Sequence, residues 1–344
     1  MGLSTLRNVG YRGLATCVPK TVVSNLDCPP QMRQERERLI RNVGIHTRRL
    51  CLPWQCFSDL AFIAAEKLLH ELKWQREEID ALIVVTQSPD YLIPATAIIL
   101  QDRLKLSQAT IAFDVNLGCS GYPFALHLLG SMISAGTVRK GLVLVGDKCA
   151  TQLDPLFSDA GTATALEGDA DAPPIYFDLN SDGSGYKAIM LPIGGHREPP
   201  AAHHFLPVKD EHGINRTPYD LQLDGAAVLS FSTQRVPPAV MRLLDYAKTD
   251  SDAIDYFLFH QANRMINETI RKKLRLPEEK VPMTLHDFGN TSGASIPVTM
   301  TARIAEALRS GRKRLLLAGF GIGLSWGECV IDIENAVFPD LIEA

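Results

Sequence analysis

The segment from Thr110 to Ala135 constrains the fold most, because it passes from an apolar strand through a cysteine-containing turn into an apolar helix. Ile111–Val115 has the pattern of a buried strand, and Tyr122–Ala135 that of a long helix. The turn between them is Gly-Cys-Ser-Gly, with Cys119 inside it. Flanking glycines permit a sharp, strained bend, and a helix start favours a thiolate. The segment predicts a nucleophilic cysteine presented at the start of a helix, with a buried structural cysteine as the alternative.

Two later segments supply side chains that complement a thiol. An apolar strand at 254–259 ends in His260, and a loop with Gly289 and Gly293 carries Asn290. Each is ambiguous alone, because a histidine at a strand end is often only a satisfied polar group and an asparagine in a loop is usually a turn former. Together with the cysteine they make a Cys/His/Asn set that can hold an acyl group and stabilise developing charge.

Apolar strands alternate with helices along the whole chain. Continuous apolar strands of this kind indicate sheets that are covered on both faces. Ala172-Pro173-Pro174 is a break between two halves, at 1–172 and 173–344. Further strands are expected at 9–14, 81–86, 141–146 and 314–317, and helices at 55–72, 99–104 and 263–274.

Composition excludes several classes of protein. The 344 residues are 46% hydrophobic and carry a formal net charge of −4, so a large core is feasible and nucleic acid is not an expected partner. No apolar run reaches the length of about 18 residues that a membrane span needs. The N-terminus lacks the layout of a secretion signal. Seven cysteines without paired spacing argue for a reducing, cytoplasmic compartment and against a disulfide framework.

The stretch 194–218 is polar and rich in proline and histidine, which predicts a surface excursion. Its histidines are irregularly spaced, so we expect no metal site there. They are His196, His203, His204 and His212.

Taken together, the motifs resemble the 3-oxoacyl-acyl-carrier-protein synthase III group of the thiolase superfamily. The order and spacing of the matching segments cover nearly the whole chain. Asn290 separates the chain from related condensing enzymes that use a second histidine or cysteine there, and plant-type polyketide synthases fit less well in length. The resemblance implies a thiolase-like five-layered αβαβα fold, with the nucleophile in the first of two similar halves and the histidine and asparagine in the second. The matching segments are 118–121, 157–161, 179–185, 260–263, 289–297 and 319–327.

The resemblance also implies a reaction. An acyl group is loaded on Cys119, and a malonyl thioester bound near His260 and Asn290 then loses CO2 and condenses with it to give a 3-oxoacyl thioester. The backbone N–H groups of Cys119 and Ile322 form the oxyanion hole, where the family usually has glycine at the second position. No cofactor or metal is implied beyond the coenzyme A or phosphopantetheine thioesters that serve as substrates.

Substrate contacts follow from the same resemblance. The acyl pocket is expected at Phe320, Gly321 and Gly323, with Ile93 of the stiff loop 88–94 reaching the partner's pocket in a homodimer. Plain interface packing is the alternative role for Ile93. Arg38 and Asn42 depart from residues that usually hold coenzyme A, so an acidic carrier protein is the expected partner of the basic clusters at 33–49 and 264–275. Ordinary solvated helix faces are the alternative for these clusters. Expected contacts for the carrier or coenzyme A are Arg38, Arg41, Asn263, Arg264, Arg271 and Lys272.

Two other functions stay open from the sequence. One is an acyltransferase that forms an ester or amide without condensation, and the other is a non-catalytic partner subunit of a condensing complex. Asn290 argues against the first, because simple transfer has less need of an amide that stabilises an enolate. Retention of all three polar residues argues against the second.

Overall fold

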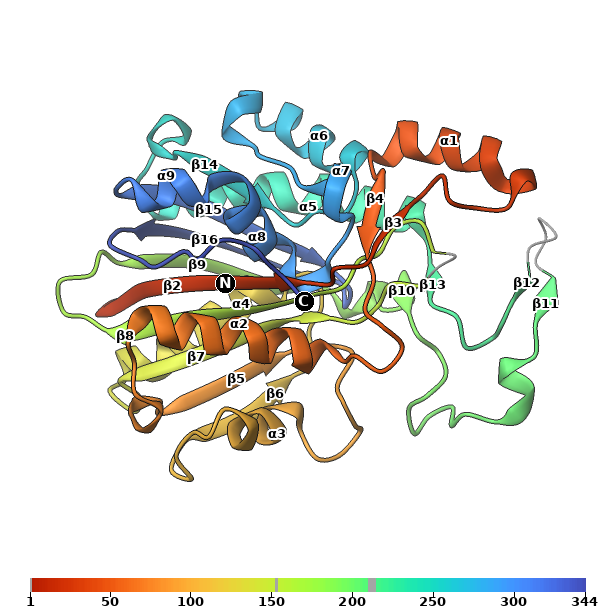
Figure 1. The fold of residues 1–344 in the computed structure, drawn as a ribbon. Coiled ribbons are helices and arrows are strands. Elements are labelled where there is room, and N and C mark those ends of the chain that lie inside the picture. Colours follow the sequence, from red (N-terminus) through yellow and green to blue (C-terminus); the bar gives the residue numbers. More distant parts are fainter. Residues whose placement is uncertain (1, 152–153, 210–214) are drawn as a thin grey trace.

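The computed structural model describes residues 2–151, 154–209 and 215–344. Its strands form two large sheets that are stacked face to face, with helices between and outside them (Figure 1). The N-terminal sheet has the order β17 (Ile342–Glu343), β2 (Val9–Val18), β8 (Ala160–Gly168), β7 (Lys140–Asp147), β5 (Ala81–Val85) and β6 (Ile111–Val115). The C-terminal sheet has the order β1 (Leu3–Leu6), β9 (Ile175–Ser181), β16 (Ser325–Ile333), β15 (Lys313–Gly321) and β14 (Tyr256–Phe259).

Three layers of helix cover these sheets, and each layer is joined to its sheet by an apolar core. The central layer lies between the sheets, where its core takes side chains from both of them. Separate cores pack the two outer layers onto the outer sheet faces. This is the five-layered αβαβα arrangement that the resemblance implied. The central helices are α4 (Gly121–Ser134), α8 (Ser295–Thr299) and α9 (Ala305–Arg309), and the outer ones are α2 (Phe57–Leu72), α3 (Thr96–Arg103), α5 (Gly225–Tyr246) and α6 (Arg264–Lys273).

Predicted strands and helices agree with the structure to within a few residues at each end. The prediction that Ile111–Val115 is buried was wrong. This strand, β6, is the edge of the N-terminal sheet and pairs only with β5, in parallel. Ile111 is exposed and the other four residues are half-buried. As an edge strand, β6 has no neighbouring strand on one side among the described residues, which leaves that side open in the single chain.

The two ends of the chain exchange sheets. Strand β1, near the N-terminus, pairs with β9 in the C-terminal sheet, and β17, near the C-terminus, pairs with β2 in the N-terminal sheet. The predicted boundary at 172/173 falls between β8 and β9, which belong to different sheets. Each sheet therefore includes one strand from the opposite end of the chain, and the division into halves at 172/173 stays a prediction.

One end of the molecule carries the irregular segments. An arm closed by β10 (Ile189–Met190) and β13 (Gln222–Leu223) projects from the body and contains β11 (Val208–Lys209) and β12 (Asn215–Arg216) (Figure 1). Most described residues of the arm are exposed, as expected for a surface excursion. Helix α1 (Arg33–Val43), the pair β3 (Val22–Ser24) and β4 (Thr47–Arg49), and α7 (Leu285–Phe288) lie nearby. Among the described residues, no helix has the length and apolar character needed to cross a bilayer.

Candidate active site

Cys119 lies between β6 and α4 and is buried, with 6% of its surface exposed. Neither flanking glycine has a left-handed φ, so the predicted strained bend was wrong. The glycines are required by close packing instead. An added Cβ at Gly118 would lie 2.4 Å from Oε1 of Gln87, and one at Gly121 would lie 2.6 Å from Cγ1 of Val85. The turn is thus a crowded junction between the start of α4 and the neighbouring strand.

The Cys119 thiol is neutral in this environment, contrary to the thiolate expected from the helix start. Burial raises its pKa to about 11, and the nearby Asp147 carboxyl acts in the same direction. Hydrogen bonds to the sulfur from the backbone N–H of Ile322, the Ser292 side chain and the Cys119 N–H lower the pKa by less. Desolvation of a charge outweighs a few donors, because a thiolate buried away from water loses most of its hydration.

The two backbone N–H groups that contact the sulfur are those predicted for the oxyanion hole. The Ile322 loop is pressed against the thiol, since an added Cβ at Gly321 would lie 2.6 Å from Cβ of Cys119. Ser325 Oγ donates to the carbonyl of Ile322 across 2.7 Å, and Ser120 Oγ lies 2.7 Å from Ser325 Oγ. Two buried hydroxyls therefore tie the loop to the start of α4.

His260 follows the last residue of β14 and is 1% exposed. Its backbone N–H donates to Ala318 across 2.8 Å, which extends the strand pairing to the histidine itself. Its Nδ1 lies 2.7 Å from Ser295 Oγ. The ring centroids of His260 and Phe320 lie 5.5 Å apart in a T-shaped arrangement. Burial lowers the pKa of His260 to about 3, and a hydrogen bond with the Ser292 backbone raises it by less. The imidazole is therefore neutral at physiological pH.

Asn290 lies between α7 and α8 and is held by its backbone and its side chain. Its N–H donates to Leu156 across 2.9 Å, and its carbonyl accepts from Ser158 across 2.8 Å. Its side-chain Oδ1 accepts from the N–H of Ser292 across 2.9 Å. Because Oδ1 is engaged by the backbone, the amide NH2 is the group that remains to donate to a substrate.

Close backbone contacts bring the three side chains to one place. An added Cβ at Gly293 would lie 2.9 Å from the carbonyl oxygen of Gly118, so the segments before α8 and α4 touch. One at Gly319 would lie 3.0 Å from the carbonyl oxygen of Cys119, so β15 passes directly beside the cysteine. His260 pairs with the first residue of α8. The site therefore forms where the central helices α4 and α8 begin.

Sequence reasoning missed three polar residues of this site. Ser292 and Ser295 lie inside the 289–297 motif, but only their contacts with Cys119 and His260 show their position. Asp147 ends β7 and is buried. Its carboxylate accepts from Thr86 Oγ1 at 2.8 Å and from the N–H of Gln87 at 2.6 Å. No sequence pattern marked this aspartate, because its partners come from another strand.

The predicted pocket residues divide into two groups. Phe320 and Gly321 lie against His260 and Cys119 respectively, so both line the site. Gly323 is exposed, with a φ of 141°. Ile93 is 86% exposed within the single chain, together with its neighbours Tyr91 and Leu92. In one copy this loop is an uncovered apolar tip.

The predicted carrier contacts are partly used by the protein itself. Arg38, Arg41 and Lys272 are exposed, as are many surface cations. Arg264 donates to the backbone carbonyl of Arg41 and so joins α6 to α1. Asn263 accepts from the N–H of Ile266 at 2.8 Å as the N-cap of α6, and Arg271 forms a two-point ion pair with Glu268. Among these residues, Asn263, Arg264 and Arg271 have structural roles that sequence reasoning did not foresee.

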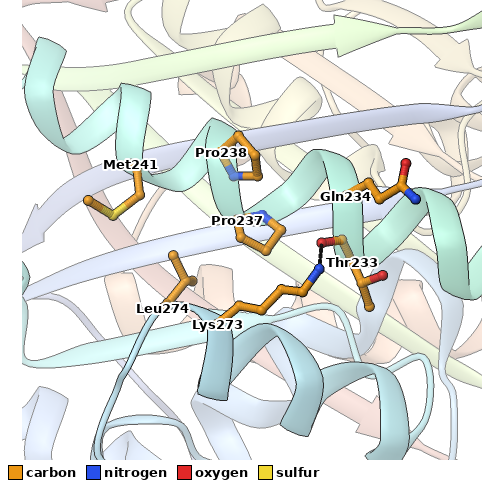
Figure 2. Close-up of a pocket in the computed structure, with 7 residues that line it drawn as sticks. All are labelled: Thr233, Gln234, Pro237, Pro238, Met241, Lys273 and Leu274. Atoms are coloured by element: carbon orange, nitrogen blue, oxygen red, sulfur yellow. Dashed lines mark hydrogen bonds between the residues drawn. The ribbon is translucent and has the colours of Figure 1, made fainter.

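A surface hollow of about 370 Å³ lies between α5 and the end of α6, and none of the predicted site residues lines it. Figure 2 shows the residues that line it. Pro237 has no N–H, so the carbonyl of Thr233 lacks its helical donor. Lys273 Nζ donates to this carbonyl across 2.8 Å and so connects the two helices. The lining residues are Thr233, Gln234, Pro237, Pro238, Met241, Lys273 and Leu274.

The histidines of the arm do not gather into a metal site in the part of the chain that the structure describes. His203 and His204 are adjacent, with ring centroids 4.0 Å apart, and His204 faces Glu198. His212 lies outside the described residues.

Comparison with known proteins gives a consistent result. Family models for 3-oxoacyl-[acyl-carrier-protein] synthase III and for its C-terminal part match residues 113–183 and 244–333. A solved 3-oxoacyl-(acyl-carrier protein) synthase from Burkholderia xenovorans is 36% identical, with 99% of both chains covered and a TM-score of 0.91. A beta-ketoacyl-[acyl-carrier-protein] synthase III of Syntrophomonas wolfei is 33% identical, covering 92% of this chain and 94% of its own. A putative 3-oxoacyl-[acyl-carrier-protein] synthase 3 of Campylobacter jejuni is 32% identical, covering 89% and 87%.

Two stacked sheets, with a cysteine, a histidine and an asparagine where the central helices start, define a thiolase-fold condensing enzyme. Within that class, the chain belongs to the 3-oxoacyl-[acyl-carrier-protein] synthase III family. It is therefore an acyltransferase of the condensing type, and neither of the two alternatives, an ester- or amide-forming acyltransferase and a non-catalytic partner subunit, is supported.

Proposed function

We propose that Cys119, His260 and Asn290 are the catalytic residues of a decarboxylative condensation. In the first half-reaction Cys119 attacks an acyl thioester, a new carbon–sulfur bond forms and the donor's bond breaks. The proton of the Cys119 thiol leaves with the departing pantetheine thiol. The N–H groups of Cys119 and Ile322 already contact the sulfur, so they are positioned to receive the oxyanion of the tetrahedral intermediate.

In the second half-reaction a malonyl thioester places its carbonyl oxygen against His260 and Asn290. Loss of CO2 leaves its electron pair as an enolate, which both side chains stabilise by donating hydrogen bonds. The enolate carbon attacks the acyl thioester on Cys119, the carbon–sulfur bond breaks, and the released thiolate takes up a proton. Decarboxylation supplies the carbanion, so we propose that no metal, flavin or nicotinamide takes part.

The observation that carries this proposal is the burial of His260, with its Nδ1 2.7 Å from Ser295 Oγ. Buried, with its pKa lowered to about 3, the ring is a neutral hydrogen-bond donor and not a general acid. A neutral donor suits an enolate oxygen, as does the free NH2 of Asn290, whose Oδ1 is held by Ser292. Both donors are fixed by contacts that do not involve substrate.

The test separates the two half-reactions. Cys119→Ala should abolish the acyl adduct seen by intact mass after incubation with short acyl thioesters, while Cys149→Ala should retain it. His260→Ala and Asn290→Ala should still acylate at Cys119 but lose roughly 10²-fold or more in condensation with a malonyl thioester. Unchanged condensation in Asn290→Ala would remove the amide from the mechanism.

We further propose that an acidic carrier protein delivers one substrate to the basic faces of α1 and α6. Arg38, Arg41 and Lys272 are among the exposed cations there, whereas Arg271 is largely neutralised by Glu268. Lys272→Glu should slow association with carrier-bound malonate without altering the rate with a short pantetheine thioester. Attraction between exposed charges acts over a Debye length of about 8 Å at physiological ionic strength, so salt should mimic the variant.

Arg7, exposed in the turn between β1 and β2, provides a matched control. Arg7→Glu changes the net charge equally and should leave carrier association unchanged. Equal slowing in both variants would attribute the effect to net charge, and the docking surface would then be abandoned.

We propose a homodimer that covers the apolar loop and the sheet edge. Leu92 and Ile93 are 85% and 86% exposed, and the neighbouring β6 has a free edge in the single chain. Loops of this kind mark protein interfaces when they are contiguous and apolar. Leu92→Asp should shift the mass measured by light scattering from dimer to monomer. An unchanged dimer would show that this loop is not part of the interface.

We also propose that the protein is cytoplasmic. All seven cysteines are unpaired, which supports a reducing compartment.

A further inference from the structure

Ser295 is the first residue of α8, and its hydroxyl is hydrogen-bonded to the His260 ring. Ser295 Oγ lies 2.7 Å from Nδ1, and both residues are 1% exposed. A neutral imidazole carries its proton on one nitrogen only, and the hydrogen bond at Nδ1 decides which one. The direction of this hydrogen bond therefore decides whether the other nitrogen, Nε2, carries the proton, and the ring makes a second hydrogen bond with the Ser292 backbone.

The surrounding contacts decide that direction. Ser295 Oγ also accepts from the backbone N–H of Gln261, at 3.3 Å, which occupies one of its lone pairs. Among the described residues, His260 Nδ1 is the one acceptor found for the hydroxyl proton. A buried hydroxyl that left its proton unpaired would lose about 1–3 kcal/mol. The O–H therefore donates to Nδ1, and the ring proton lies on Nε2.

We infer that Ser295 is a positioning residue that holds His260 as its Nε2–H tautomer, ready to donate to the enolate oxygen. The inference rests on the proposed role of His260 as a donor. With the other tautomer, Nε2 would present a lone pair to a developing negative charge, so one hydrogen bond would become a repulsion. Burial keeps the ring uncharged, so it cannot satisfy both partners by taking a second proton.

Gln261 and Thr299 in turn hold Ser295 in place. The Gln261 side chain donates to Phe259 O across 2.8 Å and accepts from the N–H of Thr284 across 3.0 Å. Thr299 Oγ1 donates to the Ser295 carbonyl across 2.8 Å. These contacts hold the backbone around Ser295 in place. A residue that selects one tautomer needs such a fixed position.

The first measurement uses the unmodified protein. In ¹⁵N-histidine-labelled enzyme at pH 7, Nδ1 of His260 should resonate as an unprotonated ring nitrogen and Nε2 as a protonated one. The signal is identified by its loss in His260→Ala. The reverse pattern would overturn the inference whatever the activity of any variant.

The second measurement removes the hydroxyl. Ser295→Ala should shift the ¹⁵N pattern toward a mixture of tautomers and lower malonyl decarboxylation by roughly 10- to 100-fold, the range for partners that orient a histidine at metal sites. Acylation of Cys119 should change far less, because it does not use Nε2–H. Ser295→Thr keeps the hydroxyl and should restore both the tautomer and the decarboxylation rate.

Thr301→Val is the matched control, since Thr301 Oγ1 bonds Thr16 Oγ1 at 2.8 Å, is similarly buried and does not touch His260. It should leave the ¹⁵N pattern and the ratio of the two half-reactions unchanged. Full decarboxylation with an unshifted tautomer in Ser295→Ala would refute the inference about Ser295. Full condensation in His260→Ala would instead refute the proposed role of the histidine.

Discussion

The resting thiol of Cys119 should be unusually slow to react, and its reactivity should rise steeply with pH. Burial raises its pKa to about 11, while His260, with a pKa of about 3, stays neutral throughout the accessible range. Cysteine hydrolases instead hold an imidazolium–thiolate pair, which keeps the thiol reactive at low pH. The two arrangements predict opposite pH profiles for alkylation.

The size of the effect follows from the fraction of thiolate. At pH 7 a pKa of about 11 leaves about one thiolate in 10⁴ molecules, against about 3% for an exposed cysteine with a pKa near 8.5. A more basic thiolate is intrinsically more nucleophilic, which offsets roughly tenfold of this difference. Alkylation of Cys119 should therefore be roughly 30-fold slower than that of an ordinary exposed cysteine.

Iodoacetamide labelling between pH 6 and pH 10, quantified at Cys119 by peptide mass spectrometry, measures the profile. The rate should climb about tenfold per pH unit without a plateau, because each unit below the pKa costs a factor of ten in thiolate. The half-exposed Cys28 in the same digest reports whether the reagent itself behaves as expected. A plateau that begins below pH 8 would reveal an ion pair and refute the neutral resting state.

Three further outcomes are expected. Gly321→Ala places a Cβ 2.6 Å from Cβ and 3.0 Å from Sγ of Cys119, so acylation measured by intact mass should fall roughly 100-fold. Glu328 is buried, with no hydrogen-bond partner for its side chain among the described residues, and burial raises its pKa well above the usual range. Since the unfolded chain ionises near pH 4, stability should drop by about 1.4 kcal/mol per pH unit until the folded pKa is reached, and Glu328→Gln should flatten this slope in urea unfolding. Lys273→Met removes the donor to Thr233 and should cost about 1 kcal/mol in the same assay.

Each of these has a control in the chain. Gly183→Ala adds a Cβ with nothing within 4 Å and should acylate normally. Glu334→Gln alters an exposed carboxylate and should keep the pH slope. Pro237→Ala restores a helical donor to Thr233, so the loss from Lys273→Met should shrink in that background. If Lys273→Met costs as much stability in the Pro237→Ala background, the explanation for Lys273 is wrong. A pH slope unchanged by Glu328→Gln would contradict the role given to Glu328. Normal acylation in Gly321→Ala would contradict the predicted crowding of Cys119.

Local sequence patterns were sufficient to locate most elements and the three central side chains. Strands such as Ala81–Val85 and helices such as Gly121–Ser134 are determined mainly by neighbouring residues. The spacing of apolar residues and the turn-forming residues at the ends therefore predict them. Cys119, His260 and Asn290 were found because each stands at the end of such an element. Their roles came from the family resemblance, and the local pattern alone left structural alternatives open.

The predictions that were wrong concern properties that depend on solvation and on contacts between residues far apart in the sequence. Ile111–Val115 was predicted to be buried because it is apolar, but only the strand order makes β6 an edge. A helix start predicted a thiolate at Cys119, but burial from distant segments raises the pKa instead. The glycines beside it were predicted to permit a strained bend, although they are needed for close contact with Gln87 and Val85, 30 and more residues away.

The sequence by itself determined that a thiol, an imidazole and an amide follow separate apolar elements, since each placement is fixed within about ten residues. Only the tertiary structure decided that Ser295 meets His260, that Asp147 lies behind the thiol, and which groups are neutral. Those properties depend on how much water and which dipoles surround a group. Solvent exclusion is created by layers far apart in the chain, so no local pattern encodes it.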